Sequence, residues 1–132
     1  MKTFILDANY LLRFLLKDNK NLFNEVQKTL NLAKNGEVKL ILPVVIFAEM
    51  IYVLDQLYEF TRKEIVEKMW IIINTPYIET EERTVLTQSL LTFLREKIHF
   101  ADCYLLERTL TSNNGVLTFD KDLQRLYTRT NE

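Results

Sequence analysis

Hydrophobic residues along the chain alternate between short continuous runs and longer runs with a helical period. Short apolar runs bounded by turn residues are typical of strands in a parallel sheet, whereas apolar positions spaced three and four apart indicate helices. The short runs predict strands at residues 3–6, 38–42, 77–79 and 116–119, and a marginal edge strand at 127–130. The first of these strands is expected to be buried on both of its faces.

The runs with helical period lie between the predicted strands. They predict one helix around the leucines at 11, 12, 15 and 16, and further helices at 20–34, from 43 to about 54, at 61–73, from 80 or 81 to about 97, from 101 to about 110, and at 121–126. Several of these helices have recognisable boundary residues. These are Asn35-Gly36 after the second helix, Pro43 at the start of the third, Thr61 with Glu64 as a capping box, Asn74-Thr75-Pro76 after the fourth, and Asp120 before the last.

Strands that alternate with helices predict an α/β fold with right-handed crossovers. The expected architecture is a three-layer α/β/α sandwich around a central, mostly parallel sheet of four to five short strands. The chain of 132 residues contains only two glycines and two prolines, which leaves little material for a linker. We therefore expect one domain that spans residues 1–132.

Composition limits the classes of protein to consider. Apolar residues make up 48% of the chain and charged residues 27%, which is ordinary for a globular protein. No apolar stretch approaches the roughly 18 residues of a membrane span, and the start lacks the apolar region of a signal peptide, so a cytoplasmic location without a membrane is predicted. The single cysteine, Cys103, cannot form an intrachain disulfide, and its apolar neighbours predict a buried thiol. A net charge of -1 gives no general attraction to nucleic acid.

Four acidic residues stand among apolar neighbours: Asp7, Glu49, Asp102 and Asp120. Burying an ionised carboxylate without a partner is costly, so a cation that collects these side chains would explain their placement. Asp7 and Asp120 directly follow predicted strands, and ligands of parallel sheets bind beyond the carboxyl ends of the strands. Glu49 lies in the helix that follows the strand at 38–42, which brings it toward the same edge. Asp102 follows a helix, so the pattern alone does not bring it there.

The segments around these acids resemble the PIN-domain ribonucleases of the VapC toxin type, which belong to type II toxin-antitoxin systems. The resemblance rests on DANYLLRFLL from residue 7, PVVIFAE up to residue 49, FADCYLL around residue 102 and LTFDKDL around residue 120. These segments match the acidic motifs of that family in order and in approximate spacing, over nearly the whole chain.

The resemblance implies a metal-dependent endoribonuclease that hydrolyses RNA phosphodiester bonds with Mg²⁺ or Mn²⁺. Oxygen ligands suit these hard cations, which can activate water and stabilise charge on phosphate. By resemblance Asp7 and Asp102 are direct ligands, Glu49 binds directly or through water, and Asp120 completes the site; one metal ion or two remain open. The implied partners are the RNA substrate, a small VapB-like antitoxin that covers the active-site groove, and a second copy of the chain in a homodimer. The apolar helices between residues 44 and 73 offer surface for such partners.

Some neighbouring residues have alternative interpretations. Asp122 competes with Asp120 for the fourth acidic position, although Asp120 follows its predicted strand more closely. Asn9 is either a helix cap or a hydrogen-bond donor to the site, and Arg13 either contacts a phosphate or an acid or is a surface residue. Other candidates are Thr118 as a support for the acids, His99 as a general acid, and Lys121, Arg125 and Arg108 as RNA contacts.

Two rival functions start from the same residues. A haloacid-dehalogenase-like phosphatase would use Asp7 as a nucleophile, but that family has a second aspartate two residues later, where this chain has Asn9. A non-catalytic PIN-fold module that only binds RNA would be expected to have lost one or more of the acids, and all four are present. The chain also lacks the glycine-rich loop of ordinary nucleotide triphosphatases.

Overall fold

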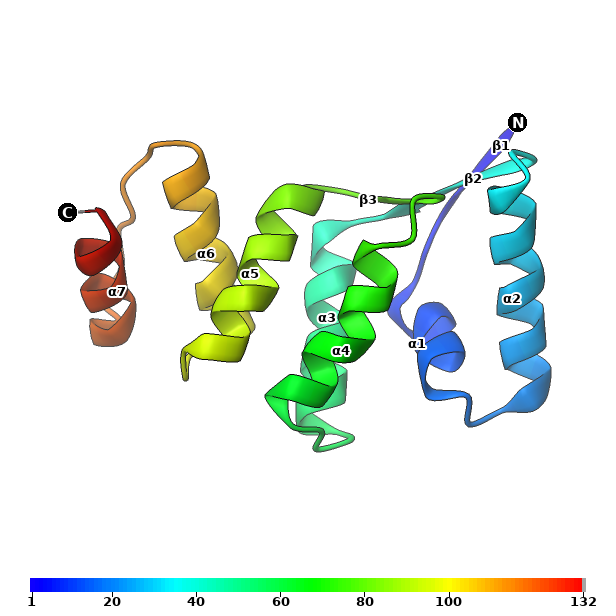
Figure 1. Cartoon of the computed structure of the whole chain (residues 1–132), viewed down its shortest axis with the longest axis horizontal. Helices are drawn as coiled ribbons and strands as arrows, with labels where there is room; N and C mark the ends of the chain where they lie inside the picture. The colour runs from blue at the N-terminus through cyan, green and yellow to red at the C-terminus, as the bar shows by residue number, and fades with distance from the viewer. Residues whose placement is uncertain (132) are drawn as a thin grey trace. The chain divides into compact units, whose positions relative to one another are not determined.

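The structure is a computed structural model that describes residues 1–131, and Figure 1 labels its helices and strands in chain order. The chain divides into two units, Met1–Glu81 and Glu82–Glu132, which are described separately below. The fold class is α/β, as the alternation of strands and helices predicts. The expectation of a single domain over residues 1–132 stays a prediction.

A parallel sheet organises the first unit. Its strands are β1 (Lys2–Ile5), β2 (Val38–Leu42) and β3 (Ile78–Thr80), and they lie in the order β1-β2-β3. Ile5 pairs with Ile41, and Leu42 pairs with Thr80. The described residues form these three strands, which is fewer than the four to five predicted. The parallel direction places the carboxyl ends of all three strands at one edge of the sheet.

Four helices connect the strands of the first unit: α1 (Ala8–Leu16), α2 (Lys20–Lys34), α3 (Val44–Gln56) and α4 (Arg62–Ile73). The predicted boundary residues are confirmed. Thr61 and Glu64 form the capping box of α4, with the Thr61 hydroxyl accepting from the Glu64 amide at 3.2 Å and the Glu64 carboxylate accepting from the Thr61 amide at 2.9 Å. Gly36 takes the positive φ of 79° that closes α2, because a glycine adopts this conformation without strain.

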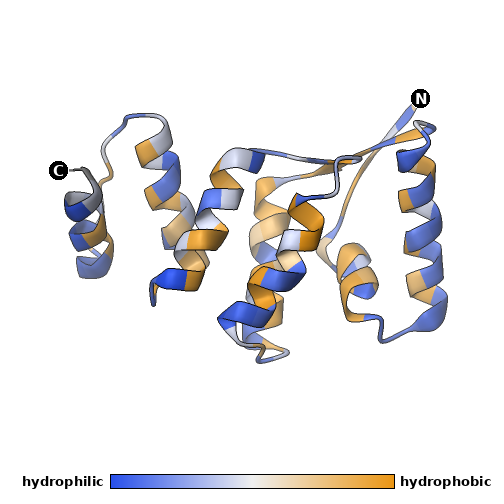
Figure 2. Cartoon of the chain, in the orientation of Figure 1, coloured by the Kyte–Doolittle hydropathy of each residue, from blue (hydrophilic) through white to orange (hydrophobic). Residues whose placement is uncertain are grey.

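The core of the first unit forms where apolar residues of these helices meet the sheet, and Figure 2 shows how apolar α3 is along most of its length. Residues with essentially no exposed surface include Leu11, Leu40, Leu42, Phe47, Met50, Leu54, Ile65 and Met69. The prediction that the first strand is buried on both faces is wrong: all four residues of β1 are exposed. In the three-strand order β1 is an edge strand, so it lacks a neighbour on one side.

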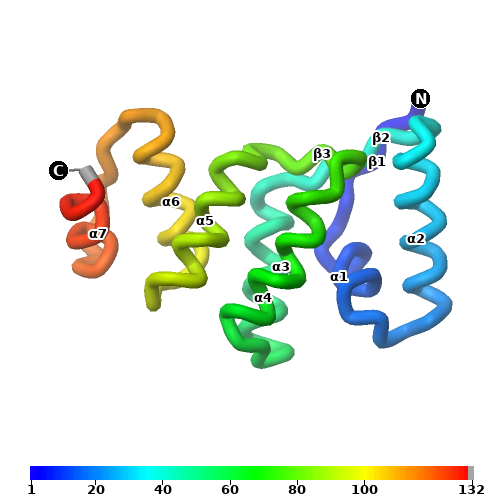
Figure 3. Tube along the Cα trace, in the orientation of Figure 1, coloured from blue at the N-terminus to red at the C-terminus, as the bar shows by residue number. Residues whose placement is uncertain are grey.

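Three helices make up the second unit: α5 (Arg83–Arg95), α6 (Phe100–Thr111) and α7 (Lys121–Asn131). The chain reverses between α5 and α6, which pack side by side (Figure 3). The rings of Phe93 and Phe100 meet edge to face at 5.9 Å between centroids, and the Thr92 hydroxyl donates to a Glu107 carboxylate oxygen at 2.6 Å. Cys103 is buried, as its apolar neighbours predict.

Two predicted strands are absent from the described part of the second unit. Residues 116–119 form no strand, and the side chains of Leu117 and Phe119 are fully exposed. Residues 127–130 belong to α7, which continues past its predicted end at 126. The buried positions Leu123 and Leu126 follow a helical spacing, and the Thr130 hydroxyl donates to the Leu126 carbonyl at 2.8 Å, so the helical pattern outweighs the strand preference of Tyr127 and Thr128.

Candidate functional site

Asp7 stands at the carboxyl end of β1. The Leu6 amide donates to the Ile41 carbonyl at 2.9 Å, which extends the ladder of the sheet to the residue before Asp7. Asp7 then adopts an extended conformation (φ -92°, ψ 155°) as the N-cap residue of α1, but its carboxylate accepts no capping hydrogen bond. The side chain is exposed. The sheet therefore presents this carboxylate to solvent with its oxygen atoms available.

Glu49 lies in the second turn of α3, which starts directly after β2 and Pro43. It is exposed, and it shares the exposed face of α3 with Val45 and Tyr52, which keep 71% and 64% of their surface open. Asp7 and Glu49 thus belong to elements that follow two neighbouring strands of the same unit, and α1 and α3 are in contact.

Glu81 is an acid at this edge that the sequence analysis missed. It follows β3, its amide donates to the Leu42 carbonyl at 3.0 Å, and its carboxylate accepts from the Val44 amide at 3.2 Å. The hydrogen bond satisfies a free amide in the first turn of α3, and a negative charge is favourable there. An acid two residues after the strand predicted at 77–79 was the available signal. Glu81 acts as a cap for α3.

Asp102 is the third residue of α6, a helix that begins after His99. The Asp102 and Cys103 amides donate to the His99 carbonyl at 3.0 and 3.1 Å. The carboxyl group is half-buried. Burial raises the pKa of Asp102, the negative charge of Asp120 raises it further, and His99 lowers it. Asp102 and Asp120 are therefore close enough to interact electrostatically within the second unit.

Asp120 precedes α7 and caps it, as predicted. Its carboxylate oxygen Oδ1 accepts from the Leu123 amide at 2.8 Å, and its own amide donates to the Thr118 hydroxyl at 3.0 Å. Asp122 is exposed and pairs with Arg125 at 3.4 Å. Of these two acids, Asp120 is the one whose charge acts on Asp102. Thr118 supports Asp120 by holding its backbone.

Several neighbouring residues have structural roles. Asn9 lies inside α1, and the N-cap residue is Asp7, so the interpretation of Asn9 as a cap is wrong. Arg13 donates from Nη1 to Asp18 at 2.8 Å and from Nη2 to the Tyr58 hydroxyl at 3.2 Å, which ties the end of α1 to the residues after α3. Arg13 is thus engaged within its own unit.

Exposure changes the energetic argument for the four acids. Asp7, Glu49 and Asp120 are exposed, so the cost of burying a carboxylate applies to Asp102 alone. Within residues 1–131, the carboxylates of Asp7, Glu49 and Asp102 form no hydrogen bond or ion pair. Free carboxylate oxygens are the ligands that Mg²⁺ and Mn²⁺ take, so each of these side chains is a chemically suitable donor for such an ion.

Two acids belong to each unit: Asp7 and Glu49 to the first, Asp102 and Asp120 to the second. Among the described residues, no three histidine, cysteine, aspartate or glutamate side chains form a group that could hold a metal ion. A cluster of all four acids stays a prediction.

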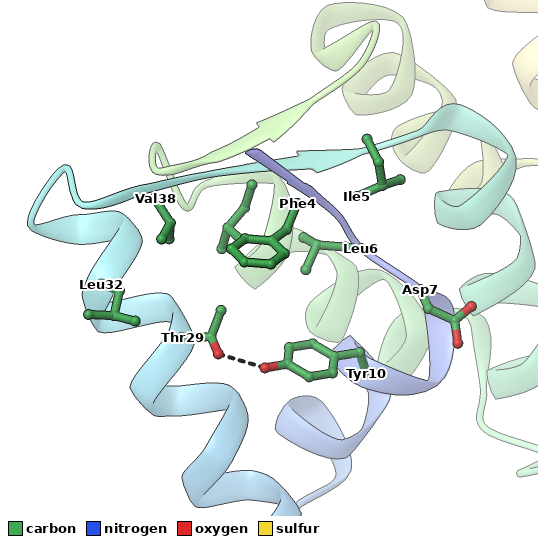
Figure 4. A pocket seen from close by; sticks show the side chains of 9 residues that line it. Phe4, Ile5, Leu6, Asp7, Tyr10, Thr29, Leu32 and Val38 are labelled. Carbon is green, nitrogen blue, oxygen red and sulfur yellow. Dashed lines mark hydrogen bonds between the residues drawn. The ribbon is translucent and has the colours of Figure 1, made fainter. Parts of the chain in front are cut away.

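An apolar cavity of about 420 Å³ lies beside β1 in the first unit (Figure 4). Phe4, Leu6, Leu32 and Val38 contribute to its lining, and Asp7 lies at its end with the carboxylate directed away from the Phe4 ring. The hydroxyls of Tyr10 and Thr29 satisfy each other in a 2.6 Å hydrogen bond. This lining is too apolar to hold a phosphate or a metal ion, so the cavity is not the centre of the chemistry.

The model of the PIN domain family matches residues 4–128 of the chain. This match covers nearly the whole sequence, and the chain belongs to the PIN domain family. PIN domains are generally nucleases that use divalent metal ions. Comparisons with curated proteins and with solved structures find no match. In the described part of the chain, each helix is too short or too polar to cross a membrane.

Proposed function

We propose that the protein is a metal-dependent endoribonuclease that hydrolyses RNA phosphodiester bonds with Mg²⁺ or Mn²⁺. Membership of the PIN domain family over residues 4–128, together with acids at all four motif positions, carries the proposal. Asp7, Glu49, Asp102 and Asp120 are the proposed ligands. The free oxygens of Asp7, Glu49 and Asp102 support this assignment, because a carboxylate that already pairs with a cation would be a poorer ligand.

Each acid would contribute in a different way. A bound ion would stabilise the charge that develops on the phosphate and lower the pKa of a bound water. Burial and the charge of Asp120 disfavour the charged form of Asp102, and a cation held there would favour that form, because a positive charge lowers the pKa of a carboxyl group. Asp120 has one oxygen held by the Leu123 amide, which fixes the direction of the other. The interaction with Asp102 favours Asp120 over Asp122 as the fourth acid.

We further propose that the protein is the toxin of a VapBC-type toxin-antitoxin pair and acts in the cytoplasm. Its proposed protein partners are a small VapB-like antitoxin and a second copy of the chain, with which it forms a homodimer. Exposed apolar side chains on α3 and α4 and on the residues between them support a protein partner on this surface. They are Val45, Tyr52, Leu57, Tyr58, Trp70 and Ile71.

Incubation of the purified protein with total RNA, with and without Mn²⁺, tests the proposal. Cleavage should require the ion, and Asp102→Asn should abolish it, because the variant keeps the shape of the side chain but loses its charge. Asp122→Asn is the matched control, since it removes one charge from an exposed acid outside the proposed set and should cleave at a rate close to that of the wild type. Equal cleavage by the Asp102→Asn protein would refute the site. Hydrolysis of a phosphate monoester without RNA cleavage would favour the phosphatase alternative.

A further inference from the structure

One face of α7 carries three cations spaced one turn apart. Lys121, Arg125 and Arg129 occupy positions i, i+4 and i+8, which lie on the same side of a helix and span about 12 Å along its axis. Together with Gln124 and Thr128 they line an open hollow of about 450 Å³. These five residues are called the α7 cationic face, and Figure 2 shows how hydrophilic this helix is.

The α7 cationic face starts at an acid of the proposed site. Asp120 caps the helix through the Leu123 amide, so Lys121 is its immediate neighbour. Gln124 donates to the Thr118 carbonyl at 2.6 Å, which fastens the segment that leads into Asp120 to the same helix. A ligand that lies along this face therefore reaches the position of Asp120 within one unit of the structure.

Two of the cations already have acidic neighbours, but they keep donors for a ligand. Arg125 pairs with Asp122 and Arg129 pairs with Glu96, each at 3.4 Å, and both arginine side chains are 60% exposed. Exposed pairs at this distance are weak, and a guanidinium has five donors, so each arginine can also donate to a phosphate. Lys121 forms no ion pair with any described residue. The five residues of the face carry three positive charges and no negative charge, while Asp122 and Glu96 pair with two of the cations and Asp120 lies at the end of the face.

Arg108, which the sequence analysis grouped with Lys121 and Arg125, is engaged elsewhere. Its Nη1 lies 3.3 Å from a Glu82 carboxylate oxygen and donates to the Tyr104 hydroxyl at 3.2 Å, and Tyr104 donates to Glu82 at 2.6 Å. This closed set of contacts uses Arg108 to connect α6 with the start of α5. It does not belong to the α7 cationic face.

We infer that the α7 cationic face binds the sugar-phosphate backbone of single-stranded RNA and guides the strand toward Asp120; this inference rests on the proposed nuclease function. Contacts from arginine, lysine, glutamine and threonine to phosphate and sugar position a nucleic acid without reading its sequence. A length of 12 Å corresponds to about three to four nucleotides at a rise of ~3.4 Å. The lining of the hollow has no apolar side chain, which makes the face a poor core for a protein interface. The apolar positions of α7, Leu123 and Leu126, are buried and cannot enter a lipid surface.

Salt dependence of RNA binding tests the inference. Fluorescence anisotropy with a labelled single-stranded RNA, in EDTA so that no cleavage occurs, gives the slope of log K against log salt. Each phosphate contact contributes about 0.7 to this slope for a single strand. The variant Lys121→Gln/Arg125→Gln/Arg129→Gln should therefore lose about 2 from the slope, and Lys121→Gln alone about 0.7. Because Lys121 forms no ion pair with the described residues, Lys121→Gln breaks no ion pair among them. This single variant therefore provides the test if the triple variant folds poorly.

Two controls separate a specific face from general charge. The variant Lys20→Gln/Lys28→Gln/Lys34→Gln removes three exposed charges from α2 and should keep the wild-type slope. Arg125→Lys/Arg129→Lys keeps both charges and should also keep the slope.

Cleavage in Mn²⁺, measured in parallel, distinguishes the two proposals. A wild-type slope in both the triple variant and Lys121→Gln overturns the inference, whatever the cleavage result, and an equal loss of slope in the α2 variant also overturns it. Absence of wild-type cleavage together with the expected slopes overturns the nuclease function and leaves the RNA-binding face supported.

Discussion

Asp120 has two roles that substitution can separate. Its carboxylate caps α7 through a 2.8 Å hydrogen bond with the Leu123 amide, and its charge raises the pKa of Asp102. Asn at this position keeps a capping oxygen but has no charge, whereas Ala removes both. The pair of variants therefore measures the cap and the charge independently.

The cap determines the difference in stability between the two variants. Loss of an N-cap costs typically about 1 kcal/mol. The entropy of unfolding of a 132-residue chain is about 280 cal/mol/K, so this cost lowers the melting temperature by about 3–4 °C. We expect Asp120→Ala to melt about 3–4 °C below Asp120→Asn in thermal denaturation followed by circular dichroism.

The charge of Asp120 contributes to the raised pKa of Asp102. Burial is the larger cause of its raised pKa, so the pKa should fall in Asp120→Asn but remain above the ordinary value of 3.8. A carboxyl group with a raised pKa in the folded state contributes stability that is complete below the unfolded pKa and is lost as the pH rises through the folded pKa. The stability lost as the pH rises through the Asp102 pKa should therefore be smaller in Asp120→Asn than in the wild type.

Carbon-detected NMR titration of the Asp102 carboxyl group measures the pKa directly. Asp122→Asn is the matched control, because it removes a charge two residues away that does not contribute to the shift of the Asp102 pKa. An Asp102 pKa that is the same in the wild type and in Asp120→Asn would refute the interaction between the two acids. Equal melting temperatures of the Asn and Ala variants would refute the cap.

The remaining predictions concern the metal and the start of α4. If the proposed acids repel one another without metal, Asp7→Asn should melt above the wild type in EDTA, and Mn²⁺ should raise the melting temperature of the wild type more than that of the variant. Glu37→Gln, which changes an exposed acid of the same unit, is the control and should alter neither the melting temperature in EDTA nor its rise with Mn²⁺. A melting temperature of Asp7→Asn below that of the wild type in EDTA would contradict clustering. Thr61→Ala removes half of the capping box and should cost about 1 kcal/mol in urea denaturation, whereas Thr61→Ser should be nearly neutral.

Elements with local signals were predictable from the sequence. α2 runs from Lys20 to Lys34 as predicted, because an apolar stripe defines its length and Asn35-Gly36 ends it. The capping box of α4 was also readable, since its two residues are three apart and satisfy each other's amides. Such features need only a few neighbouring residues.

Features that need a distant partner were not predictable in the same way. The segment at 116–119 has the composition of a strand, but a strand forms only with a neighbouring backbone, and the sequence does not specify that neighbour. The interaction of Asp102 with Asp120 connects the first turn of α6 with the residue before α7, and neither hydrophobic period nor spacing encodes it. The position of Asp7 was predictable, because a residue after a parallel strand must lie at the carboxyl edge of the sheet.

The Glu81 cap affects which ions the carboxyl edge of the sheet can bind. The free amides at the start of a helix ordinarily make a binding place for phosphate. In α3 the Val44 amide is already taken by the Glu81 carboxylate, so an incoming anion meets a resident anion and must displace it. With Asp7 and Glu49 following the two neighbouring strands, the edge selects for cations and against phosphate. A strand of RNA would then have to be held by positive charge outside this edge, because the acids here repel its phosphates.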